Sequence, residues 1–192
     1  MSLVTLDPTG ARAVDTYSIA PRLSGLNGKR VGLLHNVKTN AKELVSDIFD
    51  LLKERYDVWL VGPMLTAGQS GMLAKPGATA GTDRRRGPRD HGGGRLRVLH
   101  GCSLHNATEL EKLGIPTVVL CTEPFARTAE SMARRRGFPN YHYILVEHPL
   151  SSARREAIRQ RAEKALPEVL SILLGHEAEI SDAHRLGTAV VE

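Results

Sequence analysis

Apolar and polar residues follow one another along the chain in blocks that predict strands and helices in turn. Short apolar runs that end abruptly at polar or turn residues are typical of buried parallel strands. Longer segments with apolar residues every three or four positions are typical of amphipathic helices. The predicted strands are 31–34, 57–61, 117–121 and 143–146, and the predicted helices are 41–55, 102–113, 122–136 and 153–165. Alternating strands and helices predict an α/β fold with a parallel sheet.

The short crossovers between these elements favour one kind of α/β architecture. We expect a flavodoxin-like, doubly wound parallel sheet with helices on both faces, in three αβα layers. The chain length suits a single domain of this type. We expect an irregular N-terminal arm over 1–24, one α/β domain over 25–175 and a polar tail over 176–192.

Two local patterns concern the ends of helices. Asn40 and Glu43 have the spacing of a capping box at the start of the helix 41–55. Pro167 follows the last predicted helix, and we expect it to kink or restart that helix, which then continues toward Leu174.

Residues 77–100 do not fit the alternating pattern, which calls there for a helix and another strand. Residues 77–95 read GATAGTDRRRGPRDHGGGR and contain no Leu, Ile, Val, Met or aromatic residue to bury. Loops of such length inside a compact domain are uncommon. Two interpretations stay open: a long disordered insertion, or an out-of-frame reading of GC-rich codons, which would enrich Arg, Gly, Ala and Pro. In either case we expect an irregular insertion at about 77–100.

The positive charge of the chain is concentrated in this same segment. The whole chain has a net charge of +5, and the six arginines and two aspartates of 77–100 contribute +4 of it. A basic face that extended over the whole chain would favour a polyanion as partner. Because the charge is local, binding of nucleic acid through this segment is the least favoured of three functional hypotheses, and we expect no nucleic-acid partner.

Composition narrows the class of protein further. Hydrophobic residues make up 41% of the chain and charged residues 24%, as in ordinary globular proteins. No apolar run approaches the roughly 18 residues of a membrane-spanning helix, and the first residues lack the pattern of a secretory signal. Two cysteines are too few for a disulfide framework or a four-cysteine zinc site. We therefore expect a cytoplasmic protein with no membrane partner.

Polar residues stand where several of the predicted strands end. Open parallel sheets bind ligands beyond the carboxyl ends of their strands, so these residues are expected to converge on one site. The sets are His35, Asn36 and Lys38; Cys121, Thr122 and Glu123; Glu147 and His148; and, leading into the next helix, Gly101, Cys102 and Ser103. We expect His35, Asn36, Lys38, Ser103 and Thr122 to bind a small-molecule substrate.

Four residues of these sets are candidates for catalysis, and each also has a structural interpretation. Cys102 begins a predicted helix, whose dipole favours a reactive thiolate, or it is a small half-buried thiol. Cys121 ends an apolar strand and is either a second reactive thiol or a packed core residue. Glu123 is a general acid or base, or a charge that favours the start of a helix. His148 is a proton shuttle or a carboxylate ligand, or merely an exposed side chain.

Metal and coenzyme signatures are missing from the sequence. The eight histidines show no HxH or HExxH spacing, so no metal site is predicted. The glycines at 92–94 lack the Lys-Ser/Thr of a P-loop and the spacing of a dinucleotide fingerprint. No cofactor is therefore evident.

From residue 101 onward the sequence resembles a known family. The segment GCSLHNATELEKLGIPTVVLCTEPFARTAESMARRRGFPNYHYILVEHPL is similar to the UGSC-motif family, as are GKRVGLLHNVKTNAKEL near residue 30 and GQSGMLAKP at 68–76. The combination of HNAxELE, GIPTVVxCTE and HPL carries the resemblance, which covers most of 25–165 and is interrupted at 77–100. Members of this family are similar to part of the selenoprotein B subunit of glycine, sarcosine and betaine reductases.

The resemblance implies thiol- or selenol-dependent redox chemistry on a small organic substrate, as in an oxidoreductase of the reductase type. Cys102 and Cys121 would carry that chemistry, with Glu123 and His148 assisting. The alternative is a non-catalytic α/β module that binds a small anion or a partner through His35, Lys38 and backbone amides. An exposed edge of the sheet could pair two copies into a homodimer.

The motif that gives the family its name, selenocysteine or cysteine followed by Gly-Ser-Cys, is missing before the helix at 102. Residues 94–100 (GRLRVLH) can be encoded GGG CGA CTG CGG GTC CTG CAC. Read one base later, the same bases encode Gly-Asp-Cys-Gly-Ser-Cys-Thr. With an AGA or AGG codon for Arg97, the first of these cysteines becomes TGA, the selenocysteine codon. We therefore hypothesise a frameshift over 77–100, which would leave this form of the protein inactive.

Overall fold

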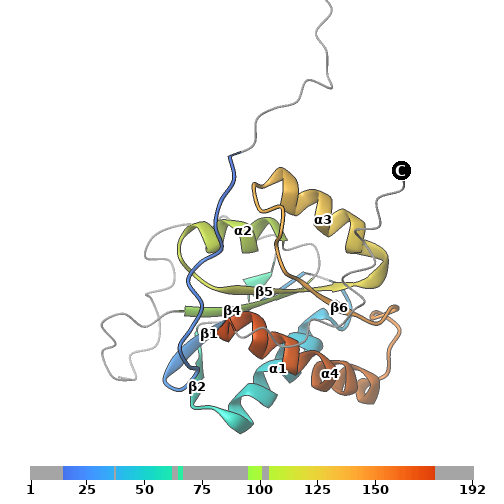
Figure 1. The fold of residues 1–192 in the computed structure, drawn as a ribbon. Coiled ribbons are helices and arrows are strands. Elements are labelled where there is room, and N and C mark those ends of the chain that lie inside the picture. Colours follow the sequence, from blue (N-terminus) through green and yellow to red (C-terminus); the bar gives the residue numbers. More distant parts are fainter. Residues whose placement is uncertain (1–14, 37, 62–64, 67–94, 101–103, 176–192) are drawn as a thin grey trace, which may run out of the picture.

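The computed structural model describes residues 15–36, 38–61, 65–66, 95–100 and 104–175, in which helices alternate with parallel strands (Figure 1). The strands are β1 (Lys29–His35), β2 (Val58–Leu60), β3 (Leu65–Thr66), β4 (Arg95–His100), β5 (Thr117–Thr122) and β6 (Ile144–Val146). The helices are α1 (Ala41–Arg55), α2 (Leu104–Lys112), α3 (Ala126–Arg135) and α4 (Arg155–Leu174), with the 3-10 turn η3 (Glu123–Phe125) before α3. The predicted α/β class is confirmed.

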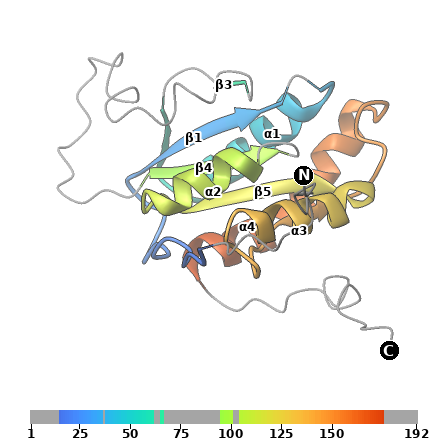
Figure 2. The ribbon, with the colours of Figure 1, turned by 90° about the horizontal axis from the view of Figure 1, so that it is seen from above.

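The described strands form one parallel sheet in the order β2-β1-β4-β5-β6, with β3 beside β1. β1, β4 and β5 lie side by side in Figure 2. In the register of β5 and β6, Leu120 pairs with Ile144 and Thr122 pairs with Val146. Because the strands are parallel, their carboxyl ends meet at one edge of the sheet, which is where open sheets bind ligands.

Helices pack against both faces of this sheet, α1 and α4 on one and α2 and α3 on the other (Figure 1). The apolar residues of β5 alternate between the two cores: Val118 and Leu120 join the cluster of α1 and α4, whereas Val119 and Cys121 join that of α2 and α3. Successive side chains of a strand point to opposite faces. A strand buried on both faces therefore reads as a continuous apolar run, as β5 does.

The N-terminal arm has neither helix nor strand over its described part, yet it packs on the body. Ala20 and Leu23 are buried. The backbone N–H of Tyr17 donates to the carbonyl of Gly137 at 2.8 Å, and that of Leu23 donates to the carbonyl of Leu173 at 2.9 Å. The arm thus contacts the layers on both sides of the sheet.

The predicted capping box at Asn40 is wrong. Asn40 precedes α1 in the left-handed conformation, with φ 65°, and its side chain makes no cap hydrogen bond. Its amide donates instead to the backbone carbonyls of Leu150, Ser151 and Ala153 at 2.8, 3.3 and 3.0 Å. A capping residue normally has an extended backbone, from which its side-chain oxygen accepts a hydrogen bond from the start of the helix. The left-handed backbone of Asn40 departs from that geometry, and its amide N–H groups bond to the distant loop instead.

Of the two expectations for Pro167, a kink or a restart, the restart is wrong, because α4 runs from Arg155 to Leu174 as one helix with Pro167 inside it. The predicted continuation toward Leu174 is confirmed. Leu166 and Val169, on either side of this exposed proline, are buried in the core. Their packing holds the helix together across a residue that lacks an N–H.

The prediction of an irregular insertion is wrong for its last six residues, since 95–100 form β4 in the sheet between β1 and β5. The segment RLRVLH has apolar residues at 96, 98 and 99, which is enough to form a strand despite its two arginines. Residues 77–94 lie outside the described part of the chain, as does the predicted tail 176–192. Among the described helices, none has both the length and the apolar character needed to cross a membrane.

Candidate functional site

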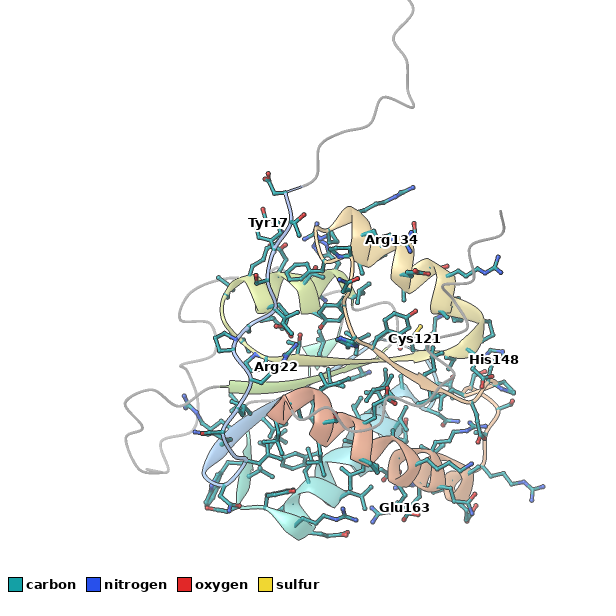
Figure 3. All side chains as sticks on the ribbon, in the orientation of Figure 1. Tyr17, Arg22, Cys121, Arg134, His148 and Glu163 are labelled. Atoms are coloured by element: carbon teal, nitrogen blue, oxygen red, sulfur yellow. The ribbon has the colours of Figure 1, made fainter. Side chains whose placement is uncertain are left out.

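A cavity of about 210 Å³ opens at the carboxyl edge of the sheet, where β1, β5 and β6 end. It is lined by polar residues Asn36, Lys38, Thr39, Cys121, Thr122, Thr128, His148 and Ser151, and by apolar residues Leu104, Phe125, Ala129, Met132 and Leu150. Figure 3 shows Cys121 and His148 toward this end of the molecule and Arg22 toward the other. The structure thus brings together five residues that the sequence singled out: Asn36, Lys38, Cys121, Thr122 and His148.

Asn36 directly follows β1 and is only 5% exposed. Its Oδ1 accepts a hydrogen bond from the backbone N–H of Lys38 at 3.3 Å, which fixes the orientation of the amide because an N–H needs an acceptor. Its Nδ2 has no hydrogen-bond partner among the residues that the structure describes. A buried donor left without a partner costs about 1–3 kcal/mol. Asn36 is therefore a cavity-lining residue whose amide carries an unused donor.

Lys38 supplies positive charge at the rim of the cavity. The side chain is exposed, and its Nζ lies 4.7 Å from the centre of the Phe125 ring, in the geometry of a cation–π contact. This contact holds the ammonium group near the start of α3. Among the described residues that line the cavity, none is an aspartate or a glutamate. The charge of the described wall is therefore positive.

Cys121 is a further residue that lines the cavity. It is the last but one residue of β5 and is 3% exposed. Its Sγ donates to the backbone carbonyl of Thr122 at 3.6 Å. Thr122, which ends β5, is 6% exposed and also lines the cavity. The cavity is therefore lined by the last two residues of β5.

Tyr143 fixes the beginning of α3 beside this sulfur. Its hydroxyl donates to the backbone carbonyl of Ala126, the first residue of α3, at 3.0 Å. Burial, and then the electrostatic effects of Glu130 and Cys121, raise the pKa of the Tyr143 phenol. The phenol therefore stays protonated and keeps its donor.

The loop after β6 forms the remaining wall and is held from two sides. His148 is exposed, and a cis peptide bond joins it to Pro149. From α1, the amide of Asn40 donates to the carbonyl of Leu150. From α4, Arg161 Nη1 donates to the carbonyl of Pro149 at 3.0 Å. These bonds hold His148 and Leu150 at the cavity.

A second interaction with α4 fixes the start of this loop. Lys164 Nζ lies 2.7 Å from Glu147 Oε1, and the hydrogen bond and charge of Lys164 lower the pKa of Glu147. Glu147 does not line the cavity. Its charge therefore serves the attachment of the loop to α4.

Several predicted residues lie elsewhere. His35 is half-buried and its Nδ1 donates to the backbone carbonyl of Asn36 at 2.6 Å, but it does not line the cavity. Glu123 is exposed on the first turn of η3 and does not line the cavity either. Cys102 and Ser103 fall outside the described ranges, two positions and one position before Leu104.

Residues from the helical segment after β5 were missed by the sequence analysis. Phe125, Thr128, Ala129 and Met132 line the cavity. Counted from Phe125, the other three stand three, four and seven positions later, which places all four on one face of a helix that begins at the carboxyl end of a strand. That spacing was the available signal. Leu150 and Ser151 had no comparable signal, because their place depends on the loop that Asn40 holds.

A different buried polar cluster lies toward the other end of the molecule and anchors the N-terminal arm. The carboxylate of Glu111 is fully buried and accepts hydrogen bonds from the N–H of Ala20 at 2.6 Å and from Arg22 Nη1 at 3.0 Å. It also accepts from the N–H and the hydroxyl of Thr117, both at 2.9 Å. The Thr117 hydroxyl is 2.7 Å from that of Tyr141. Every one of these contacts is internal, so the cluster is structural.

A model of the UGSC family matches residues 4–76 and 101–175 of this sequence. The chain belongs to the UGSC family. Every described residue that lines the cavity falls within the matched segments of this UGSC-family protein. The match leaves out 77–100, the interval that did not fit the alternating pattern. No curated protein matched the sequence. Within the described ranges, no group of three or more His, Cys, Asp or Glu residues could hold a metal ion.

Proposed function

We propose that this UGSC-family chain binds a small organic substrate in the cavity and acts on it by thiol redox chemistry, with Cys121 as the reacting sulfur. The observation that carries the proposal is the place of Cys121 in the wall of a cavity that also contains the unused donor of Asn36. Polar groups converging on a mostly apolar cavity are typical of small-molecule sites. The resemblance that HNAxELE and GIPTVVxCTE carry in the sequence implies a relation to reductase selenoprotein B subunits, and this expectation supports the choice of a reductive reaction.

Two thiols supply the two electrons that such a reduction needs. The thiolate of Cys121 attacks one atom of the substrate bond, forms a covalent bond to it, and the other atom leaves with a proton. The thiol of Cys102 then attacks the Cys121 sulfur, forms a disulfide, and releases the rest of the substrate with a second proton. Two electrons pass from the two thiols to the substrate. In the sequence, Cys102 precedes the cavity-lining residue Leu104 by two positions.

The strand order supports assigning the fold to the flavodoxin-like, doubly wound class. With the short β3 set aside, the order β2-β1-β4-β5-β6 corresponds to the order 2-1-3-4-5 of that class. Its ligands bind at the carboxyl edge, beside the first strand. Asn36, the residue after β1, lines the cavity at that edge.

Alkylation of single-cysteine variants tests the proposal. In C102S, we expect iodoacetamide to modify Cys121 faster than it modifies glutathione at neutral pH, measured by mass spectrometry of timed samples. C102S/C121S serves as the control for background labelling. Mild oxidation of the wild-type chain should form the disulfide, with the loss of two hydrogens. A Cys121 that reacts no faster than glutathione, together with no disulfide, contradicts the redox proposal.

The second candidate is a non-catalytic binding module, and one observation on Cys121 supports it. The thiol is buried and donates to its neighbour's carbonyl, as a packed structural cysteine does. In that case both alkylation and disulfide formation are absent, whereas the cavity still binds small molecules. The alkylation and oxidation experiments therefore separate the two candidates, because only the redox protein shows a fast-reacting Cys121 or a disulfide.

The nucleotides that encode residues 70–105 test the frameshift hypothesis. If one inserted or deleted base restores Gly-Asp-Cys-Gly-Ser-Cys, or selenocysteine in place of its first cysteine, the native protein contains the family motif immediately before α2. The redox proposal then extends to those residues. Arginine codons confirmed in an intact frame refute the frameshift and leave Cys102 and Cys121 as the thiols of the chain.

A further inference from the structure

We propose that the ligand of this cavity is a small organic anion, whose charged oxygen group binds the Asn36 amide and the Lys38 ammonium and whose apolar body packs against Leu104 and Met132. The inference rests on the proposed function in one respect, since both place the ligand in the same cavity. It concerns the class of ligand rather than the reaction.

The unused donor of Asn36 is the first observation. Asn36 is 5% exposed, and its Oδ1 is engaged by the N–H of Lys38, so the amide orientation is fixed. Nδ2 has no partner among the described residues, and Asn36 lines the cavity. A ligand oxygen at this position would satisfy the donor, whereas a ligand N–H would not.

The charge of the wall is the second observation. Lys38 lines the cavity beside Asn36, and the Phe125 ring holds its Nζ at 4.7 Å. No described residue of the wall is an aspartate or a glutamate. A ligand ammonium would therefore find no opposite charge among the described residues that line the cavity. The site favours an anion over a zwitterion such as an amino acid.

The apolar part of the wall is the third observation. Leu104, Ala129, Met132 and Leu150 line the cavity together with Phe125. A volume of about 210 Å³ corresponds to roughly seven water molecules. It therefore suits an anion with a short hydrocarbon body. Inorganic phosphate would leave the apolar wall unused.

Three compounds of nearly the same shape test this inference: butyrate, neutral butyramide and zwitterionic 2-aminobutyrate. Each is titrated into uniformly ¹⁵N-labelled full-length protein, and inorganic phosphate serves as an anion without a body. We expect butyrate to shift the side-chain amide resonances of Asn36 in a saturable way, with at least tenfold weaker binding of the other three. Absence of a butyrate shift, or equal binding of all the probes, overturns the inference.

Variants assign the contacts. N36D replaces the donor with a carboxylate, and K38M removes the ammonium from an exposed side chain, so K38M leaves the fold intact. We expect each variant to weaken butyrate binding about tenfold or more, because each loses a hydrogen bond that involves a charged group. The matched controls are N27D, at an exposed asparagine, and K112M, whose ammonium lies 4.0 Å from the Tyr17 ring away from the cavity. Equal effects of K38M and K112M overturn the inference.

The inference and the proposed function fail in different ways. If butyramide binds as well as butyrate and Cys121 is reactive, the anion inference is overturned and the redox proposal stands. If butyrate binds selectively but Cys121 in C102S reacts no faster than glutathione, the inference stands and the redox proposal falls.

Discussion

Two buried polar side chains, Asn36 and Glu111, differ in how fully their hydrogen-bonding groups are used. The carboxylate of Glu111 accepts four hydrogen bonds, from Ala20, Arg22 and Thr117. Asn36 engages its oxygen but leaves Nδ2 without a partner among the described residues. Satisfied buried groups stabilise a fold, and an unsatisfied one lowers its stability. The contrast separates the structural residue Glu111 from Asn36, the residue that we propose binds the ligand.

The first prediction concerns Glu111. In E111Q, an amide N–H replaces an acceptor oxygen and leaves the mostly buried Arg22 without its carboxylate. We expect the free energy of unfolding to fall by about 3 kcal/mol, measured by urea denaturation. E109Q is the matched control, because Glu109 pairs with Lys112 and Arg136 at the surface, where the loss is about 1 kcal/mol or less. A similar loss in both variants would show that the Glu111 cluster is not an anchor.

At the scale of elements, the junction between α1 and the loop after β6 decides the shape of the cavity. Asn40 lies immediately before α1, and its amide donates to the carbonyls of three residues that immediately precede α4. The loop therefore takes its position from a residue more than a hundred positions earlier in the chain. Leu150 and Ser151 line the cavity as a consequence.

The second prediction separates the contribution of the Asn40 side-chain amide from that of its left-handed backbone. N40G keeps the left-handed backbone and removes the amide, and we expect a loss of about 1–3 kcal/mol in the free energy of unfolding. N40A removes the amide and also strains the backbone at φ 65°, which adds about 1 kcal/mol. Thermal and urea unfolding measure both variants. Equal stability of N40G and N40A would mean that the left-handed backbone carries no strain.

The elements themselves could largely be predicted from the sequence. The apolar run at 117–121 and the periodic residues of 41–55 match β5 and α1 closely, because burial on two faces or on one face leaves a local pattern. The capping box at Asn40 was wrong because its partners are distant in sequence. The strand β4 was missed because two arginines stand among its apolar residues.

The candidate site was predictable only in part. Residues at strand ends, such as Asn36 and Thr122, were identified because parallel strands end at a common edge. His35 also stands at a strand end, but its ring donates a hydrogen bond to the backbone carbonyl of Asn36. The sequence pattern does not show which of two neighbouring residues lines the cavity. Met132 was missed because a cavity wall and a core face have the same helical spacing.

At the scale of the whole molecule, two cores on opposite faces of the sheet share β5 and are joined by the arm. Tyr141 belongs to the core of α2 and α3, and its hydroxyl meets that of Thr117, which also bonds to Glu111. Burial, and then the charge of Glu111, raise the pKa of the Tyr141 phenol. The protonation of this phenol therefore affects the stability of the entire fold.

The third prediction follows from that pKa. The folded chain holds the Tyr141 proton at a pH where the unfolded chain, with an ordinary tyrosine pKa near 10, releases it. The stability due to this difference is full below about pH 10 and declines as the pH rises above it. Urea unfolding at a series of pH values from about 8 to 11 measures the decline. Y141F should be less stable at neutral pH, by about 1 kcal/mol for the lost hydrogen bond, but should decline less steeply. An equally steep decline in Y141F would contradict the prediction.

The attachment of the arm has a consequence for the order of events during synthesis. Ala20 leaves the ribosome before Glu111, whose carboxylate binds its backbone N–H and which follows 91 residues later. At about 5–20 residues per second, the arm waits roughly 5–20 s for that partner. Its contact with Leu173 forms only after nearly all of α4 has been made. The arm is thus synthesised well before the segments on which it docks, and its apolar residues Ala20 and Leu23 stay open to chaperones throughout that interval.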